Sequence, residues 1–513
     1  MRVALSQLAD HYDLIVIGGG ITGAGILREA VRTGARVLLV DARDFASGTS
    51  SWSSKLVHGG LRYLKEGQWR LTLESVRERQ RLIAEVPGLI EPLQFLMPIR
   101  RGASPGRRIM QLGLAIYDLM GGRRRSGWYD ATHVLQQLPG LLHERLLGAV
   151  HYEDARTDDA RLVMRLILEA IAEGGQALNY VRATVTTTVN GRVEGVVLQD
   201  DVAGGSRHIR SQMVINATGV WAAGLTGAPD GAPPLRPLRG SHLVFPATVL
   251  PLPAAVSWLH PRDRRPIFAY PWEGATVFGT TDLDHDQSLD DPRMTPSEVS
   301  YLMEGLHAEF PGLSIAADQA LSCYAGVRPV IASGKADPSA ESRESARWVS
   351  PGLIGITGGK LTTFRVTARQ VLNEAARQYP LLKPSRQRAP LFRAAGSAGS
   401  RVSRLEARFG AHAERLIAES PDQDRAQIGH TPYCWAELRW AATHERVVHL
   451  QDLLMRRTRL GLVSPQGGAE WMERIGAICR DTLGWDEIRW QQERQTYLDD
   501  WQRHHAPVAT DPA

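Results

Sequence analysis

The feature that most constrains the fold is an apolar strand pattern near the N-terminus that runs directly into a cluster of glycines. Residues 13–20 read DLIVIGGG, and this short β-branched run predicts a strand buried on both faces, as in a parallel sheet. The next stretch, ITGAGILREAVRTG, has helical character with Gly34 as its stop. Gly18, Gly20 and Gly23 therefore stand in the G-x-G-x-x-G spacing of a dinucleotide-binding strand–turn–helix unit.

Each part of this unit has a physical task. Gly18 permits the tight turn, Gly20 lets a pyrophosphate approach backbone N–H groups, and Gly23 allows the helix to pack closely on the strand. The helix N-terminus offsets phosphate charge. A second strand, ARVLLVD, ends at Asp41, whose carboxylate can accept hydrogen bonds from ribose hydroxyls. The pattern predicts a Rossmann-like nucleotide site but does not separate NAD from FAD.

Two further segments favour a flavin. Residues 48–64 read GTSSWSSKLVHGGLRYL, and so many donors beside glycines suit a buried pyrophosphate and flavin edge. Residues 352–378 read as a strand, a glycine turn (GGKLTT, 358–363) and a helix. The helix dipole and Lys360 would stabilise the N1–C2=O region of a flavin, which becomes anionic on reduction. The candidate cofactor-binding residues of these two segments are Thr49, Ser50, Ser51, Ser54, Lys55, Leu56, His58, Gly59, Gly358, Gly359, Lys360, Leu361 and Thr362.

The composition is that of an ordinary globular protein and excludes several other classes. The 513 residues suffice for two or three domains, and 60 basic against 55 acidic residues give a net charge of +5. This charge fits an anionic substrate or a membrane surface, and no zinc-knuckle or RNP-like pattern indicates nucleic acid. Cys323, Cys434 and Cys479 form no close pair, so we expect a reducing compartment and neither disulfides nor a metal site. With no signal peptide and no spanning apolar run, we expect a protein in the cytosol or on a membrane surface.

The combined motifs resemble one family over nearly the whole chain. These motifs are DLIVIGGGITGAGI, TSSWSSKLVHGGLRYL, DDARLV, INATGVWA, RGSHLVFP, VFGTTD, YAGVRPV, GGKLTTFR and AELRWAATHERVVHLQDLLMRRTRLGL. Together they resemble the FAD-dependent (aerobic, respiratory) glycerol-3-phosphate dehydrogenases, within the D-amino-acid-oxidase-like flavoproteins. HGGLRYL and RGSH are the most specific of them. The ribose-contacting acid is Glu in many flavoproteins of this type and Asp41 here, which is a shorter reach with the same chemistry.

The resemblance implies a cofactor, a reaction and a location. It implies FAD, and oxidation of sn-glycerol 3-phosphate to dihydroxyacetone phosphate by hydride transfer to flavin N5. Electrons would pass on to a membrane quinone. The protein would then be cytoplasmic and peripheral on the inner face of the cytoplasmic membrane, in contact with an anionic membrane surface, and we allow for a homodimer.

The order of the motifs implies an α/β fold with a discontinuous, Rossmann-like FAD-binding domain, a β-rich substrate domain and an α-helical C-terminal domain. We expect the FAD-binding domain at residues 1–80, 151–219 and 326–382, and the substrate (cap) domain at 81–150 and 220–325. A basic Pro/Gly/Ser-rich linker (383–400) and the helical domain (401–513) follow. Within the helical domain we expect residues 436–462 to form an amphipathic element with charge on one face. In the related folds MVINATG returns the chain to the cofactor, which adds Ala217, Thr218 and Gly219 to the cofactor-binding residues.

The substrate's phosphate requires several cations, with Arg preferred for its bidentate geometry. Four cations stand in motif context: Arg62, Arg328, Arg343 and Lys360. The resemblance assigns Arg328 and Arg343 to substrate or phosphate binding and places Lys360 near flavin and substrate. Arg347 could take the place of Arg343 by a shift in register.

The proton acceptor is less strongly specified than the cations. His242, in RGSHLVFP, is our candidate, because a neutral imidazole titrates in the right range. We therefore assign His242, Arg328 and Lys360 to catalysis, and count His242 among the substrate-binding residues. Alternatively, His242 is a core histidine, Arg328 stabilises an alkoxide and water or hydroxide takes the proton. His58 could contact the cofactor instead.

Two other functions are compatible with the same fold. The first rival is an amine or amino-acid oxidase of the same fold that uses O2, and the second is a flavin-binding regulator without turnover.

Residues 107–125, RRIMQLGLAIYDLMGGRRR, form an apolar helix-like run with arginines at both ends. This segment is either an interfacial helix that meets anionic headgroups or a buried helix with solvated ends.

Overall fold

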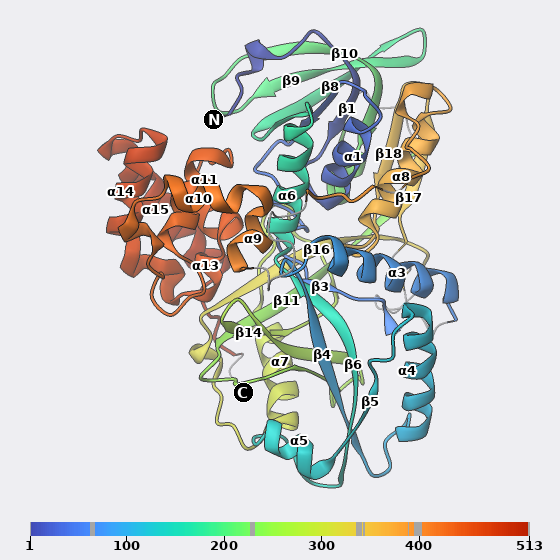
Figure 1. Ribbon diagram of the computed structural model, residues 1–513, viewed down its shortest axis with the longest axis vertical. Coiled ribbons are helices and arrows are strands. Elements are labelled where there is room, and N and C mark those ends of the chain that lie inside the picture. Colours follow the sequence, from blue (N-terminus) through green and yellow to red (C-terminus); the bar gives the residue numbers. More distant parts are fainter. Residues whose placement is uncertain are drawn as a thin grey trace.

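The computed structural model describes residues 2–61, 67–225, 231–334, 341, 344–387, 389–393 and 403–510. The described strands form two large sheets, and helices make up the C-terminal part of the chain (Figure 1). In Figure 1 the first sheet lies at the top, the second at the bottom, and the C-terminal helices lie to the left of the region where the sheets meet.

The first sheet is built around parallel strands. Its main order is β17-β18-β10-β1-β2-β7, and β9 joins β10 to β8. Strands β1, β2, β7, β10 and β18 run parallel, whereas β17, β8 and β9 pair antiparallel with their neighbours. The strands are β1 (His11–Ile17), β2 (Val37–Val40), β7 (Gln176–Leu178), β8 (Val181–Val189), β9 (Arg192–Asp200), β10 (Ser206–Asn216), β17 (Ala346–Ser350) and β18 (Leu353–Thr357).

Strand β1 is buried on both faces, as its sequence predicts. Leu14 and Val16 belong to the core that packs under α1 (Ile21–Val31), α6 (Asp159–Ala172) and α8 (Phe364–Ala375). Ile15 and Ile17 point to the other face, into the core shared with β8, β9 and β10. This alternation follows from the two-residue period of a strand, and it explains why the part from Leu14 to Ile17 contains no polar residue.

The second sheet carries most of the segment between the nucleotide-binding motifs. Its main order is β15-β11-β14-β13-β12-β4-β6-β3, with β16 beside β11 and β5 beside β6. One face packs against α5 (Ala131–Gln137) and α7 (Pro296–Glu309). The strands are β3 (Leu56–Val57), β4 (Ile90–Arg100), β5 (Gly127–Asp130), β6 (Leu146–Thr157), β11 (Leu235–Pro246), β12 (Ala255–Leu259), β13 (Pro266–Trp272), β14 (Ala275–Gly279), β15 (Leu283–Asp284) and β16 (Ser322–Ile331).

The opposite face of the second sheet shares one continuous core with the C-terminal helices. Val244 and Tyr324 of the sheet belong to the same buried cluster as Leu438, Ile475 and Trp501. The helices are α9 (Arg404–Phe409), α10 (Ala413–Glu419), α11 (Trp435–His444), α12 (Leu450–Asp452), the π-helical turn η8 (Leu453–Arg457), α13 (Leu460–Val463), α14 (Met472–Leu483) and α15 (Glu487–His504). The helical domain is therefore packed against the rest of the protein.

One expectation about these helices is wrong. Residues 436–462 were expected to form an amphipathic element with charge on one face, but the chain breaks there into α11, α12, η8 and α13. Its arginines at 456, 457 and 459 are buried. They turn inward because buried aspartates of the nucleotide-binding part lie opposite them.

The expected domain boundaries stay a proposal. Strands β6 and β16 cross the proposed boundaries at 150/151 and 325/326, and both belong to the second sheet. The start of the expected linker is packed, since Leu391 and Phe392 are buried and Arg28 donates from Nε to the Leu391 carbonyl at 2.7 Å. Residues 388 and 394–400 lie outside the described residues. Within the described ranges, no helix combines the length and apolarity needed to cross a bilayer.

Candidate active site

Four predicted cofactor segments meet at one edge of the first sheet. Because β1, β2, β10 and β18 are parallel, their carboxyl ends lie together. Gly18 follows β1, Asp41 follows β2, Ala217 follows β10 and Gly358 follows β18. The last two segments are joined directly, since Thr357 donates from Oγ1 to the Gly219 carbonyl at 2.8 Å. The topology thus brings together residues that are widely separated along the chain.

The first glycine turn has no room for side chains at Gly18 and Gly23. Its backbone is therefore suited to close approach by a nucleotide. Gly18 has a φ of +108°, and a Cβ there would lie 2.5 Å from the Ala217 carbonyl oxygen. A Cβ on Gly23 would lie 1.8 Å from the Gly18 carbonyl oxygen. Helix α1 then begins at Ile21, whose N–H donates to the Ser50 hydroxyl at 2.9 Å. Gly20 and Ser50 therefore both lie at the helix N-terminus, where a pyrophosphate would bind.

Asp41 is held in a fixed orientation beside this turn. Its carboxylate accepts hydrogen bonds from the Gly19 N–H at 2.6 Å and from the Arg43 N–H at 2.8 Å. Burial raises the pKa of Asp41 to about 6, although both N–H groups act in the opposite direction. A carboxylate at the end of β2 fits the ribose of a dinucleotide, as its position in the sequence predicts.

The serine-rich loop after β2 uses several of its polar groups internally. Thr49 donates from Oγ1 to the Val327 carbonyl at 2.6 Å, and Ser51 donates from Oγ to the Ala46 carbonyl at 2.6 Å. Lys55 is fully buried and donates to the Ser51 carbonyl at 2.7 Å. Burial lowers its pKa to about 8, although the nearby Asp159 raises it. Cofactor contacts of Thr49, Ser51 and Lys55 stay a prediction, since these side-chain groups hold the loop itself.

The loop of residues 58–60 (HGG) lies against the loop of residues 358–363 (GGKLTT). Thr362 donates from Oγ1 to the His58 carbonyl at 3.0 Å. Gly59, which follows Leu56 of β3, donates its N–H to Asp154 at 3.2 Å, and a Cβ there would lie 2.3 Å from Tyr117 Oη. On the other side Gly358 and Gly359 have φ values of +74° and +89°, and Lys360 and Leu361 are half-buried. The loop before α8 therefore has the glycine-dependent backbone that its sequence predicts.

His242 is buried on the face of the second sheet that is turned toward these loops. Its Nε2 lies 3.0 Å from the Ser54 hydroxyl, and its ring stacks on Tyr324 with centroids 4.7 Å apart. Its Nδ1 is buried and makes no hydrogen bond within the described residues. Burial, and then the charges of Arg328 and Lys55, hold the pKa of His242 well below 6.5. The imidazole is therefore neutral and able to accept a proton.

Arg328 lies on the same face of the sheet as His242. In the β11–β16 register His242 pairs with Tyr324 and Leu238 pairs with Arg328, so the side chains at 242, 324 and 328 point to one side. Between them Gly240 pairs with Gly326, and a Cβ on Gly240 would lie 2.4 Å from Arg328 Nη2. The glycine leaves room for the guanidinium to cross the strand.

Sequence reasoning missed the residues that hold the Arg328 guanidinium. Asp282 accepts from Arg328 Nη1 at 2.8 Å, and Thr280 Oγ1 accepts from Nη2 at 3.2 Å. Both belong to the VFGTTD motif, which the sequence pointed to only as part of the family resemblance. The motif's carboxylate was a signal, because an acid at the end of an apolar strand is seldom buried without a cationic partner.

Two predicted substrate residues, Arg62 and Arg343, lie outside the described residues. The alternative to Arg343, Arg347, is exposed on the edge strand β17 and donates to Gln370 of α8 at 2.5 Å. The structure thus places Arg347 in a surface contact with α8.

Comparison with known proteins agrees with this geometry. Residues 13–371 match the family model described as FAD dependent oxidoreductase, and residues 362–490 match the C-terminal domain of alpha-glycerophosphate oxidase. An aerobic glycerol-3-phosphate dehydrogenase of Bacillus subtilis is 38% identical over 378 residues, covering 72% of this chain and 68% of the relative. One of Staphylococcus saprophyticus is 30% identical over 536 residues, covering 97% and 96%. This chain belongs to the aerobic glycerol-3-phosphate dehydrogenase family.

Solved structures extend the match to the family's fold. A Bacillus halodurans glycerol-3-phosphate dehydrogenase complexed with FAD has a TM-score of 0.78 and 28% identity, covering 96% of this chain and 95% of that one. An L-alpha-glycerophosphate oxidase of Mycoplasma pneumoniae with FAD bound has a TM-score of 0.56 at 17% identity, covering 74% of this chain and 97% of that one, which shows the fold alone. The predicted fold class and FAD as the family's cofactor are confirmed.

Proposed function

We propose that this protein oxidises sn-glycerol 3-phosphate to dihydroxyacetone phosphate with bound FAD. The observation that carries this proposal is the 30% identity that extends over 97% of this chain and 96% of a relative named for that activity. The match includes both the nucleotide-binding part and the C-terminal helices. Support comes from the site, where a neutral histidine and an oriented arginine lie on one face of the second sheet.

The residues present fit FAD along the edge of the first sheet. The turn from Gly18 to Gly23 and the N-terminus of α1 would hold the pyrophosphate, and Asp41 would bind the ribose. Residues 358–363 and the N-terminus of α8 would lie beside the flavin ring. When bound, FAD supplies the acceptor for a hydride at its N5 atom.

Arg328 would orient the substrate through its phosphate or its oxygen atoms. The guanidinium is only 20% exposed and is held by Asp282 and Thr280, so little conformational freedom remains to be lost on binding. The Asp282 carboxylate offsets part of its charge, so a phosphate carrying nearly two negative charges needs further cations. We propose Lys360, Arg62 and Arg343 for this role.

His242 would take the hydroxyl proton of the substrate. Its neutral ring can accept a proton, and the contact with Ser54 and the stacking on Tyr324 fix the ring plane. The alternative remains that Arg328 stabilises an alkoxide and water takes the proton.

We also propose that the electrons pass to a membrane quinone while the protein lies on an anionic membrane surface. Helix α4 (Arg107–Gly121) supports this, because it buries Leu114 and Tyr117 on one face and leaves other apolar side chains exposed. Ile109, Leu112 and Leu119 are 67%, 65% and 81% exposed. The helix is preceded by Gly106 and followed, beyond Gly122, by three arginines. This arrangement supports the interfacial helix over the buried helix with solvated ends.

Anaerobic titration of the purified flavoprotein tests the reaction. We expect glycerol 3-phosphate to bleach the flavin absorbance with one equivalent of dihydroxyacetone phosphate formed, and added quinone to restore the colour. Bleaching by amino acids instead would identify the oxidase of the same fold. Failure of both substrates to bleach a fully loaded flavoprotein would favour a flavin-binding regulator and overturn the proposal.

A further inference from the structure

One turn of the C-terminal domain holds both ends of the serine-rich loop. We call residues 44–55 the 44–55 segment and residues 456–459 the 456–459 turn. At the first end, Asp44 accepts from Arg456 Nε at 2.6 Å and from Arg457 Nη1 and Nη2 at 2.7 and 2.8 Å. All three side chains are buried. Although burial alone would raise it, the two arginines hold the pKa of Asp44 well below its usual range.

The other end of the 44–55 segment is held through α6. Arg459 donates from Nε to Asp158 at 2.9 Å, and its Nη2 pairs with Asp159. Asp159 in turn accepts from the Ser53 hydroxyl at 2.7 Å and pairs with Lys55 Nζ at 3.3 Å. Between these two anchored ends lie Thr49, Ser50 and Ser51, and Ser54 lies 3.0 Å from His242.

The backbone of the 456–459 turn explains how neighbouring arginines reach two different places. The π-helical turn η8 is followed by its C-cap residue Thr458, whose N–H and Oγ1 both donate to the Leu453 carbonyl at 2.9 Å. Arg457 is also tied to the Glu445 carbonyl at 2.8 Å and Arg459 to the Met455 carbonyl at 2.7 Å. Contacts within the C-terminal domain therefore help to orient the guanidinium groups of Arg457 and Arg459 toward the aspartates.

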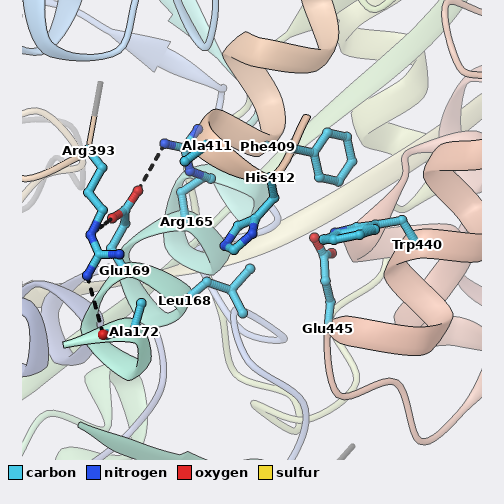
Figure 2. A pocket seen from close by; sticks show the side chains of 10 residues that line it. All are labelled: Arg165, Leu168, Glu169, Ala172, Arg393, Phe409, Ala411, His412, Trp440 and Glu445. Carbon is cyan, nitrogen blue, oxygen red and sulfur yellow. Dashed lines mark hydrogen bonds and ion pairs between the residues drawn. The ribbon is translucent and has the colours of Figure 1, made fainter. Parts of the chain in front are cut away.

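Polar and apolar side chains line a small pocket at this junction. Figure 2 shows this pocket between α6 and the C-terminal helices, with Glu169 and Arg393 on one side and Phe409 and Trp440 on the other. Glu445 also lines it and accepts from Arg161 Nη1 at 2.6 Å. Removing one partner of such a buried pair would leave an uncompensated buried charge, so these ion pairs restrict how the two parts can dock.

We propose that the 456–459 turn is a positioning device for FAD, so that cofactor binding and docking of the C-terminal helices are thermodynamically coupled. The inference rests on the proposed placement of FAD against Thr49, Ser50, Ser51 and Ser54. Arg456, Arg457 and Arg459 hold the 44–55 segment in the shape that binds the cofactor. Coupling is reciprocal, so FAD must also stabilise the docked turn.

Hydrogen exchange of the unmodified protein tests the reciprocal effect. We expect FAD removal to speed amide exchange in residues 450–463 as well as in the 44–55 segment, and added FAD to restore protection. Exchange in α14, which belongs to the same domain, should change little. Protection of residues 450–463 that is identical with and without FAD would overturn the proposal.

Variants test the forward effect through FAD affinity, measured by flavin fluorescence on apoprotein. We expect Arg457→Met to weaken FAD binding by about tenfold or more, within the range usual for coupled sites. Arg439→Met is the matched control, since the aspartates that Arg439 contacts, Asp424 and Asp481, both lie in the C-terminal domain. A residue that only stabilises the fold would lower the melting temperature and leave FAD affinity unchanged, and that result would overturn the proposal.

The outcomes separate this inference from the proposed function. A wild-type protein that binds FAD and is bleached by glycerol 3-phosphate retains the function even if Arg457→Met binds FAD normally. If Arg457→Met does not fold, the exchange experiment on the wild-type protein decides the question alone.

Discussion

At the scale of single residues, burial shifts the pKa values of two side chains at the site in opposite directions. Low dielectric disfavours the charged form of any group, so it lowers the pKa of a histidine and raises that of an aspartate. His242 is kept neutral in this way, and the positive charges of Arg328 and Lys55 add to the effect. Asp41 becomes easier to protonate, and the two N–H groups that it accepts from offset this only in part.

The His242→Gln variant should reduce the rate of flavin reduction by on the order of 100-fold or more, because glutamine preserves shape and hydrogen bonding but cannot accept a proton. The measurement is anaerobic stopped-flow bleaching at saturating glycerol 3-phosphate. FAD content serves as the control and should stay normal. An unchanged rate would remove the histidine as base and favour the alkoxide route.

The pH dependence of the wild-type rate gives a second readout of the same prediction. The acceptor is lost when His242 becomes protonated, so the rate falls as pH drops through the pKa of this residue. Since that pKa lies well below 6.5, the rate should be flat from alkaline pH down to pH 6.5 and fall only at lower pH. An acidic limb centred at or above pH 6.5 would contradict a buried neutral histidine as the base.

FAD affinity should weaken in acid because of Asp41. Its ionised form accepts hydrogen bonds from ribose hydroxyls, and with a pKa of about 6 it becomes protonated as the pH falls through that value. We expect the Kd at about pH 5 to be roughly tenfold higher than at about pH 8, as linkage predicts for one titrating group. Fluorescence titration of apoprotein measures it, and Asp41→Asn should flatten the dependence. A wild-type Kd independent of pH would refute the assignment.

At the scale of elements, helix α4 has one face packed against the protein and another face exposed to solvent. Its inner face buries Leu114 and Tyr117, and Tyr117 Oη donates to Asp154 at 2.7 Å, the same carboxylate that accepts from the Gly59 N–H. Its outer face leaves Ile109, Leu112 and Leu119 exposed. An apolar stripe beside arginines is therefore connected, through one carboxylate, to the loop proposed to meet the flavin.

Replacing Leu112 and Leu119 by Ser should release the protein from vesicles that contain anionic lipid. Each leucine would contribute about 1.5–3 kcal/mol if fully buried in the membrane, so the double variant should partition at least tenfold less. Co-sedimentation with vesicles measures this, and reaction with a water-soluble acceptor should stay normal. Ile488→Ser is the matched control, since Ile488 is 72% exposed on α15. Unchanged partitioning of the leucine variant would discard α4 as the contact.

At the scale of the whole molecule, local rules predicted the nucleotide-binding half well. The two-residue side-chain period predicted the buried strand β1. The demands of tight backbone turns predicted the glycines at 18 and 23 and the turn before α8. Both signals lie within short stretches of sequence. The helix in residues 107–125 was also predicted, and it ends at Gly121.

Pairings between distant residues were not predictable in the same way. Arg328 with Asp282 and Lys55 with Asp159 depend on how separate strands and helices come together, and composition gives no distance between them. The inward turn of the arginines at 456, 457 and 459 is the clearest case. A charged run usually marks a solvated face, and only the buried aspartates of a different part of the chain reverse that expectation.

The arrangement of the first sheet has a consequence for how the protein is made. Strand β18 inserts beside β10 and supplies the last parallel edge, although it follows β1 by most of the chain. A ribosome must therefore translate Leu353–Thr357, and then let it fold back, before the nucleotide edge is whole. Nascent chains that stall before this strand would therefore lack a complete nucleotide edge and would not retain a flavin.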